Sequence, residues 1–174
     1  MTKHLSPSIG SIAAFWGIIG VSAILLMAVS RMLGHVLEGF LEYEMGLPHY
    51  ALLIPWLFFM VYSEGYKGFQ KGFSPRVAAR AYYLKSNATW LRALLAPLFC
   101  MAFFDSTRKR KIVVGCLLVG VTLLVVLFRQ IPQPWRGVLD VGVVAGLSWG
   151  VVATWVFFFR YWFGDGETAD PEIP

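Results

Sequence analysis

Four long stretches of this 174-residue chain contain no charged side chain. A helix that crosses the hydrocarbon core of a bilayer needs about 20 predominantly apolar residues, with roughly 17 to 25 tolerated. Each stretch meets that requirement, so we predict an all-α polytopic membrane protein with about four transmembrane helices. The uncharged stretches cover residues 12–30, 45–63, 112–128 and 141–159. With their flanking residues, the predicted spans are 12–33, 45–63, 112–129 and 141–162.

The composition supports lipid as the solvent for much of the chain. Hydrophobic residues make up 57% and charged residues 14%, against roughly 45–50% and about 25% in soluble domains. We therefore expect one transmembrane domain over residues 1–163. The excess of 15 basic over 10 acidic residues would suggest nucleic acid as the partner of a soluble protein. In a membrane protein it instead reports orientation, and we expect no nucleic-acid partner.

A fifth apolar run, within residues 88–104, is shorter and contains Pro97. Basic residues precede it in segment 64–92 and follow it at 108–111. If the run dips into the membrane and returns, both basic groups lie on the cytoplasmic face, as the positive-inside rule favours. We therefore predict a re-entrant or interfacial helix, both termini in the cytoplasm, and an inner (plasma) membrane location. A five-span chain is the alternative.

The ends of the predicted domain carry two further signals. The tail at 164–174 is acidic and is expected to be disordered and solvated. In the basic segment, Ser74-Pro75 is typical of a helix start. The amphipathic helix that follows is expected to lie on the anionic leaflet. The residues predicted to contact lipid headgroups are Lys67, Lys71, Arg76, Arg80, Lys85, Arg108, Lys109, Arg110 and Lys111.

A polar stripe follows the first span, made up of Arg31, His35, Glu38 and Glu42. Steps of three and four residues fall on one helical face, so the first helix is expected to continue past the bilayer to about Glu44. One interpretation is a metal or proton site that also uses His49. The other is a solvated face with ion pairs one turn apart. A carboxylate-bridged metal centre needs a second such motif on a facing helix, which the sequence lacks, so we expect no bound metal.

A second pattern follows the second span. Read as a helix, it places Gly65, Gly68 and Gly72 on one stripe and Tyr66, Phe69 and Phe73 on another. Small-residue stripes let helix backbones approach closely. We therefore predict a docking surface for another helix or a lipid, more sensitive to Gly68→Leu than to Phe69→Leu. The alternative is a flexible loop or packing within the chain.

The sequence contains no phosphate-cradle, haem-attachment or catalytic-triad motif, and no cofactor is expected. Cys100 and Cys116 have no metal-site spacing and are expected to be buried free thiols. Of the ionisable residues, only His49 lies within an uncharged stretch, which argues against a self-contained pump. We predict a non-catalytic accessory or interaction subunit that meets a membrane-protein partner or a second copy. The alternatives are a small oligomeric transporter or channel, and a metal or redox enzyme using His35, Glu38, Glu42 and His49.

Overall fold

The computed structural model describes residues 5–164 and 168–173, and within them every regular element is a helix. The predicted all-α class is confirmed. The elements are α1 (Pro7–Leu41), α2 (Leu47–Met60), the π-helix η1 (Val61–Phe73), α3 (Ser74–Asn87), α4 (Trp90–Leu94), α5 (Ala96–Cys100), α6 (Arg108–Phe128) and α7 (Trp135–Phe163).

Three of these helices, α1, α6 and α7, are long and apolar enough to cross a membrane. Neither the fourth span nor the re-entrant helix is confirmed. The stretch predicted at 45–63 is divided, because α2 has only 14 residues before the backbone changes to a π-helix, and a span needs about 20. The run predicted at 88–104 forms two helices of five residues each, α4 and α5.

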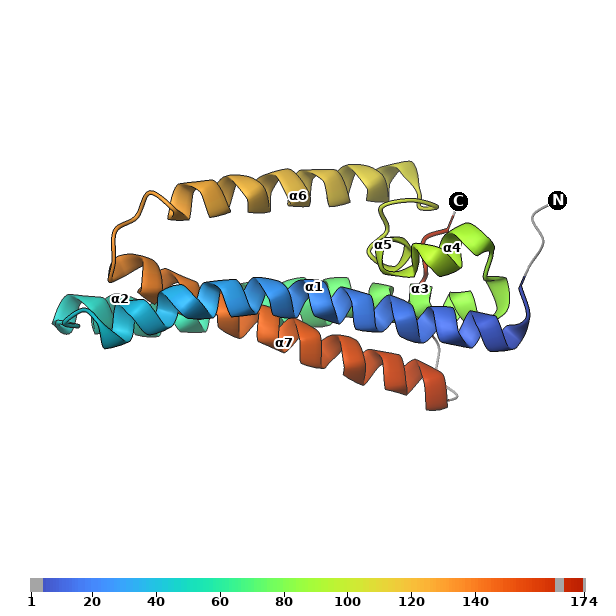
Figure 1. Ribbon diagram of the computed structural model, residues 1–174, viewed down its shortest axis with the longest axis horizontal. Coiled ribbons are helices and arrows are strands. Elements are labelled where there is room, and N and C mark those ends of the chain that lie inside the picture. The colour runs from blue at the N-terminus through green and yellow to red at the C-terminus, as the bar shows by residue number, and fades with distance from the viewer. Residues whose placement is uncertain (1–4, 165–167, 174) are drawn as a thin grey trace.

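The segments α2, η1 and α3 nevertheless follow one another without leaving the helical region. The backbone stays right-handed helical at Met60, Val61 and Phe73, where one segment passes into the next. One helical run therefore extends from Leu47 to Asn87. Figure 1 shows its α2 end beside the end of α1, while α3, α4, α5 and both chain termini gather at the opposite end.

The helical run from Leu47 to Asn87 packs against a row of glycines on α7. Gly142, Gly146 and Gly150 are buried and four residues apart, and we call them the glycine groove. A methyl group added at Gly146 would lie 2.8 Å from Oε2 of Glu64. Glycines at this spacing let two helices approach to backbone distance in a membrane. The side chains that fill the groove belong to Trp56, Met60, Glu64 and Phe69.

The π-helix keeps the facing residues in register with the groove. Glu64, Phe69 and Ser74 come at five-residue steps, whereas the groove repeats every four. In an α-helix of 3.6 residues per turn, five-residue steps would turn away from α7. The i→i+5 hydrogen bonds of a π-helix widen each turn, so the three side chains stay on one face. Ser74 Oγ donates to the carbonyl oxygen of Gly150 at 3.3 Å.

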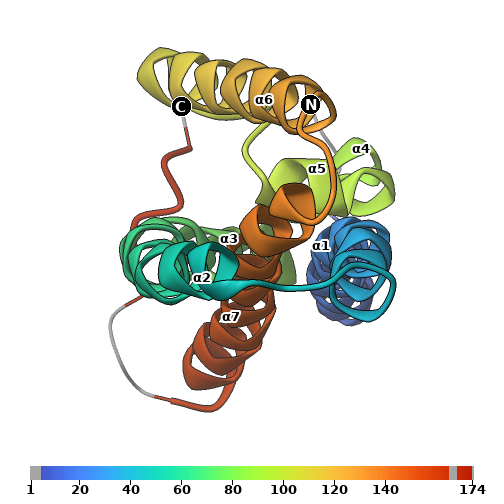
Figure 2. The same cartoon turned by 90° about the vertical axis from the view of Figure 1, so that its left-hand side faces the viewer.

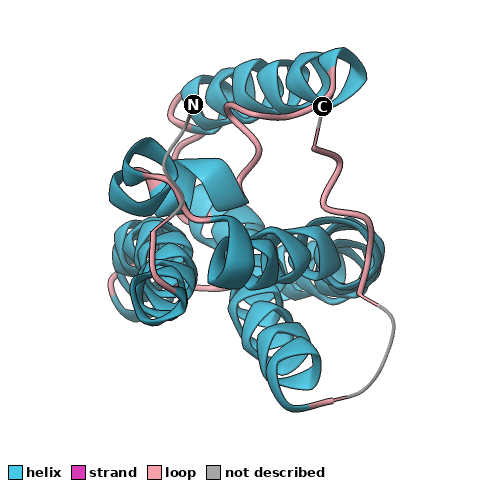
Figure 3. Cartoon of the chain, turned by 90° about the vertical axis from the view of Figure 1, so that its right-hand side faces the viewer, coloured by secondary structure: helices cyan, strands magenta, loops and turns pink. Residues whose placement is uncertain are grey.

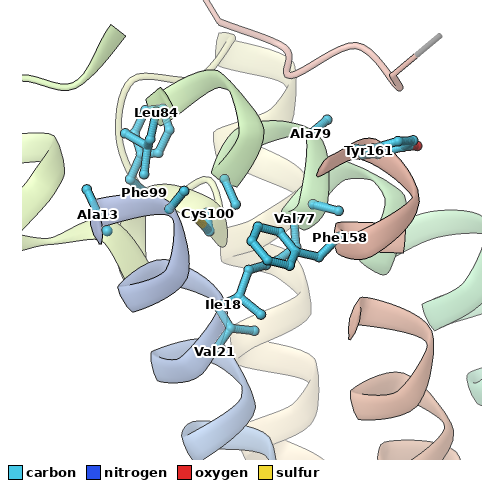
Figure 4. Close-up of a cluster of buried hydrophobic side chains, with 14 of the residues drawn as sticks. Ala13, Ile18, Val21, Val77, Ala79, Leu84, Phe99, Cys100, Phe158 and Tyr161 are labelled. Carbon is cyan, nitrogen blue, oxygen red and sulfur yellow. The ribbon is translucent and has the colours of Figure 1, made fainter. Parts of the chain in front are cut away.

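The apolar core lies at the end that carries the termini. It brings together α1, α3, α5 and α7, and Figure 4 shows Phe158 of α7 between the side chains of α1 and α3. Its most fully buried side chains include Ile18, Val77, Leu84, Phe99 and Phe158.

Helix α6 stands apart from the other long helices. None of its 21 residues is buried. Figure 2 shows it separate from α1, α2 and α7, and the view from the opposite end in Figure 3 shows the same separation. Short connections join α6 to α5 and α7, and no other helix packs along it.

The glycine groove predicts that Gly150→Leu destabilises the fold. The added side chain would meet the ring of Phe69, and overpacking of this kind costs about 1–3 kcal/mol. Thermal unfolding of the purified protein in detergent is expected to shift to lower temperature.

The matched control is Gly120→Leu in α6, where an added Cβ meets no atom within 4 Å. This variant is expected to unfold at the temperature of the unmodified chain. Equal unfolding temperatures for the two variants would contradict the packing of η1 into the groove.

Candidate functional site

A group of polar side chains lies where the end of α1 meets the start of α7. We call His35, Glu38, Gln133, Arg136 and Asp140 the polar cluster. Nη2 of Arg136 is 2.7 Å from Nε2 of His35, and Nε of Arg136 is 3.8 Å from Oδ2 of Asp140. Gln133 Nε2 donates to the carbonyl oxygen of His35 at 2.9 Å and contacts Oε2 of Glu38 at 3.3 Å.

A second close helix contact creates this cluster. Gly39 of α1 and Gly137 of α7 face each other, and both are buried. A methyl group added at Gly137 would lie 3.1 Å from the carbonyl oxygen of His35. Because the two backbones touch, the polar side chains that flank the glycines converge on one another.

The structure brings together only part of the predicted polar stripe. His35 and Glu38 join the cluster, with His35 Nδ1 and Glu38 Oε2 3.8 Å apart. Glu42 is exposed. His49 instead packs against Trp135, with the two ring centres 4.3 Å apart.

The metal interpretation therefore lacks a ligand set. Among residues 5–164 and 168–173, no group of three or more His, Cys, Asp or Glu side chains is placed to hold a metal ion. The residues that do contact His35 come from about 100 positions further along the chain, so the sequence pattern alone could not identify them.

The polar cluster borders a cavity of about 740 Å³ between α1, α2, α6 and α7, which we call the interhelical cavity. Most of its wall is apolar, with residues such as Met27, Phe59 and Leu124. The ionisable residues that line it are Arg31, His35, Glu64, Arg129, Arg136 and Asp140.

Two of these ionisable residues are carboxylates, Asp140 and Glu64. Asp140 is 3% exposed and lies in the first turns of α7. Glu64 contacts Gly146 near the middle of α7, and its Oε2 is buried without a hydrogen-bond partner in the described part of the chain. Each carboxylate lies one position outside an uncharged stretch, Glu64 after 45–63 and Asp140 before 141–159.

Within the chain, the three glycines of the η1 stripe have different surroundings. Only Gly65 is buried, and a methyl group added there would lie 3.2 Å from the Trp149 ring of α7. The nearest atom to a Cβ added at Gly68 is the carbonyl oxygen of Ser63, 3.4 Å away in the same helix. For Gly72 the nearest atom is likewise the carbonyl oxygen of a residue in η1, 3.3 Å away.

The aromatic stripe carries the closer contact with α7. Phe69 packs on Gly150, and its ring meets that of Phe73 edge-on at 5.4 Å. Tyr66 instead lies under the ammonium group of Lys71, 4.7 Å from the ring centre. Within the chain, Phe69→Leu is therefore expected to cost more fold stability than Gly68→Leu. That Gly68→Leu disturbs a partner contact more than Phe69→Leu stays a prediction.

Arg80 corrects the expectation of a headgroup contact in the basic segment. It is 1% exposed. Its guanidinium donates to the carbonyl oxygens of Phe99 at 2.6 Å, Pro171 at 2.7 Å, Phe104 at 2.9 Å and Asp105 at 3.0 Å. Burial lowers the pKa of Arg80 to about 10, so the group remains charged at neutral pH. Arg80 thereby ties α3 to the loop after α5 and to the C-terminal segment.

The described part of the acidic tail, residues 168–173, is correspondingly not a free solvated end. The backbone N–H of Thr107 donates to the carbonyl oxygen of Glu172 at 3.3 Å. Nε of Arg110 is 3.5 Å from Oε2 of Glu172. Residues 165–167 and 174, which belong to the same predicted tail, lie outside the described residues.

The other residues predicted to contact headgroups form two groups, one partly buried and one exposed. Arg76, Lys85 and Arg110 are partly buried, and Lys85 lies 4.7 Å from the ring centre of Trp162. Contact of the exposed group with an anionic leaflet stays a prediction. The exposed group consists of Lys67, Lys71, Arg108, Lys109 and Lys111.

The contacts of Arg80 predict that Arg80→Gln opens the end of the bundle. Four carbonyl oxygens would lose their donor, and each buried polar group left unpaired costs about 1–3 kcal/mol. Cys100 beside this site is buried, and burial raises the pKa of its thiol to about 12. In a Cys116→Ser background, Arg80→Gln is expected to let a maleimide label Cys100 at neutral pH.

The control is Arg108→Gln, which removes an exposed basic side chain and is expected to leave Cys100 protected. A Cys100 thiol that stays unreactive in the Arg80→Gln variant would show that the guanidinium is not needed to close this end.

No model of a known protein family, no curated protein and no solved structure matches the chain.

Proposed function

We propose that this chain is a non-catalytic interaction subunit of a membrane assembly, and that α6 is the helix that contacts its partner. The observation that carries the proposal is that α6 has no buried residue and that its residues 112–128 are uncharged. Helices in a membrane associate through close packing, which small residues favour. On α6, Gly115 and Gly120 have open space around them, and Cys116 is exposed.

The proposed partner is a helix of a different membrane protein with acidic residues just outside the membrane. The reason is charge at the start of α6, where Arg108, Lys109 and Lys111 are exposed. Two copies that paired through α6 in the same orientation would bring these basic groups side by side. Like charges in contact oppose association, whereas opposite charges favour the correct partner.

We further propose that α2 and η1 form a fourth crossing, so that both termini lie on the cytoplasmic side of an inner membrane. The support is the antiparallel course of α1, of the run from α2 to α3, of α6 and of α7 in Figure 1. The basic residues at the start of α6 then lie on the same side of the membrane as α3 and α4, which agrees with the positive-inside rule.

The exposed thiol of Cys116 provides the test of the partner proposal. A photo-crosslinker attached to Cys116 in native membranes is expected to join the chain to a second membrane protein. Gly120→Leu is expected to reduce that crosslink strongly, because the larger side chain would hold the two backbones apart.

Gly34→Leu on α1 is the matched control, because an added Cβ there also meets no atom within 4 Å. It is expected to leave the crosslink unchanged. A crosslink equally sensitive to both variants, or one only between two copies of this chain, would contradict the proposed partner surface.

A transport function is the second candidate, and the observation that favours it is a pair of carboxylates on the cavity wall: Asp140, which is buried, and Glu64, whose Oε2 is buried. Ionisable residues between membrane helices often mark ion or proton paths. An interaction subunit predicts no such path.

The two functions differ in a flux measurement. Vesicles that contain the purified chain and a pH-sensitive dye are expected to acidify no faster than empty vesicles after a pH jump. A proton flux that Glu64→Gln abolishes and Glu42→Gln preserves would replace the interaction proposal with transport, since Glu42 is exposed and does not line the cavity.

A further inference from the structure

The interhelical cavity has one charged end and one apolar end. On α1 it is lined from Arg31 back to Ile24, and on α6 from Arg129 back to Val121. The lined segment of each helix spans seven or eight residue steps, which is about 10–12 Å along the helix axis. Arg129 directly follows α6 and Arg136 lies in the first turn of α7, whereas Arg31 lies ten residues before the end of α1. The connection from α6 to α7 is at the end that faces away from the chain termini in Figure 1.

Among the residues that line the charged end of the cavity, basic side chains outnumber acidic ones. Arg136 is placed 3.8 Å from Asp140, which partly neutralises it. Arg31 and Arg129 form no ion pair with any residue in the part of the chain that the structure describes. Glu64 is opposite Gly146, about 9 Å deeper along α7 than Asp140 at 1.5 Å per residue, so it does not cancel the charge of these two arginines.

The apolar walls come from helices that leave a space between them. Residues of α6 such as Leu124 and Val125 face residues of α1 and α2 such as Met27 and Phe59 across the cavity. In a bilayer such a space is filled by acyl chains, because water finds few hydrogen-bond partners there. The volume of about 740 Å³ is within the range of roughly 300–1,000 Å³ found for small-molecule sites.

We propose that the interhelical cavity binds a phospholipid with an anionic headgroup, taken from the leaflet at the end that carries Arg31, Arg129 and Arg136. The phosphate-bearing headgroup lies against the arginines, whose planar guanidinium groups suit phosphate oxygens. One acyl chain lies between α6 and the pair α1 and α2. The lipid thereby supports α6 from the bundle side and leaves the outer face of α6 free.

The test measures lipid retention by the full chain. Protein purified in neutral detergent is titrated with phosphatidylglycerol or with phosphatidylcholine of the same acyl chains, and native mass spectrometry counts the lipids that stay bound. We expect one tightly held phosphatidylglycerol and weaker binding of phosphatidylcholine. Equal affinity for the two lipids would overturn the proposal.

Two variants separate the headgroup from the acyl contact. Arg31→Gln with Arg129→Gln is expected to weaken phosphatidylglycerol binding about fivefold for each charge removed. Arg160→Gln, near the far end of α7, is the control, because Arg160 is exposed and does not line the cavity; it is expected to leave the affinity unchanged. An arginine double variant that binds as tightly as the unmodified chain would overturn the headgroup site.

Val125→Trp is designed to fill the cavity without changing any charge, because Val125 lines it. Val126→Trp is the control, because Val126 is 52% exposed and does not line the cavity. We expect the first variant alone to lose lipid retention, with both unfolding at similar temperatures. Unchanged retention in the Val125→Trp variant would overturn the acyl contact.

Inorganic phosphate distinguishes a lipid site from a simple anion site. At equal ionic strength, phosphate and chloride are expected to displace the lipid equally little. Displacement by millimolar phosphate but not by chloride would identify a site for the free anion and overturn the lipid proposal.

Discussion

The packing of Glu64 and Phe69 into the glycine groove of α7 is the contact on which the rest of this structure depends. Gly146 and Gly150 have no Cβ, so η1 approaches α7 to a distance that any larger residue would prevent. In a membrane the hydrophobic effect does not hold two apolar helices together, and close packing has to do so. The contact fixes the direction of the run from α2 to α3 and thereby the side of the molecule on which α3 and its basic residues lie.

The polar interactions depend on the same kind of close approach. Gly39 against Gly137 brings α1 and α7 together, and Arg136 then lies between His35 and Asp140. A charge between membrane helices is costly unless it is paired or reaches water. The pairing of Arg136 with Asp140 reduces that cost, whereas Arg31 and Arg129 keep their charge for a ligand. Helix α6 has no glycine contact with the bundle and is left apart.

Some of this could be predicted from the sequence, since the uncharged stretches identify the apolar helices. The change from α-helix to π-helix at Val61 could not be predicted, because it arises from the packing register against α7 and has no local sequence signal. Arg80 was expected at the membrane surface from its place on an amphipathic helix. Its burial depends on carbonyl oxygens of α5, its following loop and the C-terminal segment. The role of Arg136 could not be predicted, because its partner His35 on α1 is about 100 residues away and Asp140 joins the cluster through Arg136.

We propose that α2 and η1 cross the membrane beside α7 and return the chain to the side of its termini. The crossing is tested most directly by labelling single cysteines with an impermeant maleimide in sealed cells, in a background without Cys100 and Cys116. Our account predicts that cysteine at position 42 is labelled from outside, whereas cysteines at positions 86 and 109 are protected until the cells are opened. Labelling of position 86 from outside would contradict a crossing by α2 and η1.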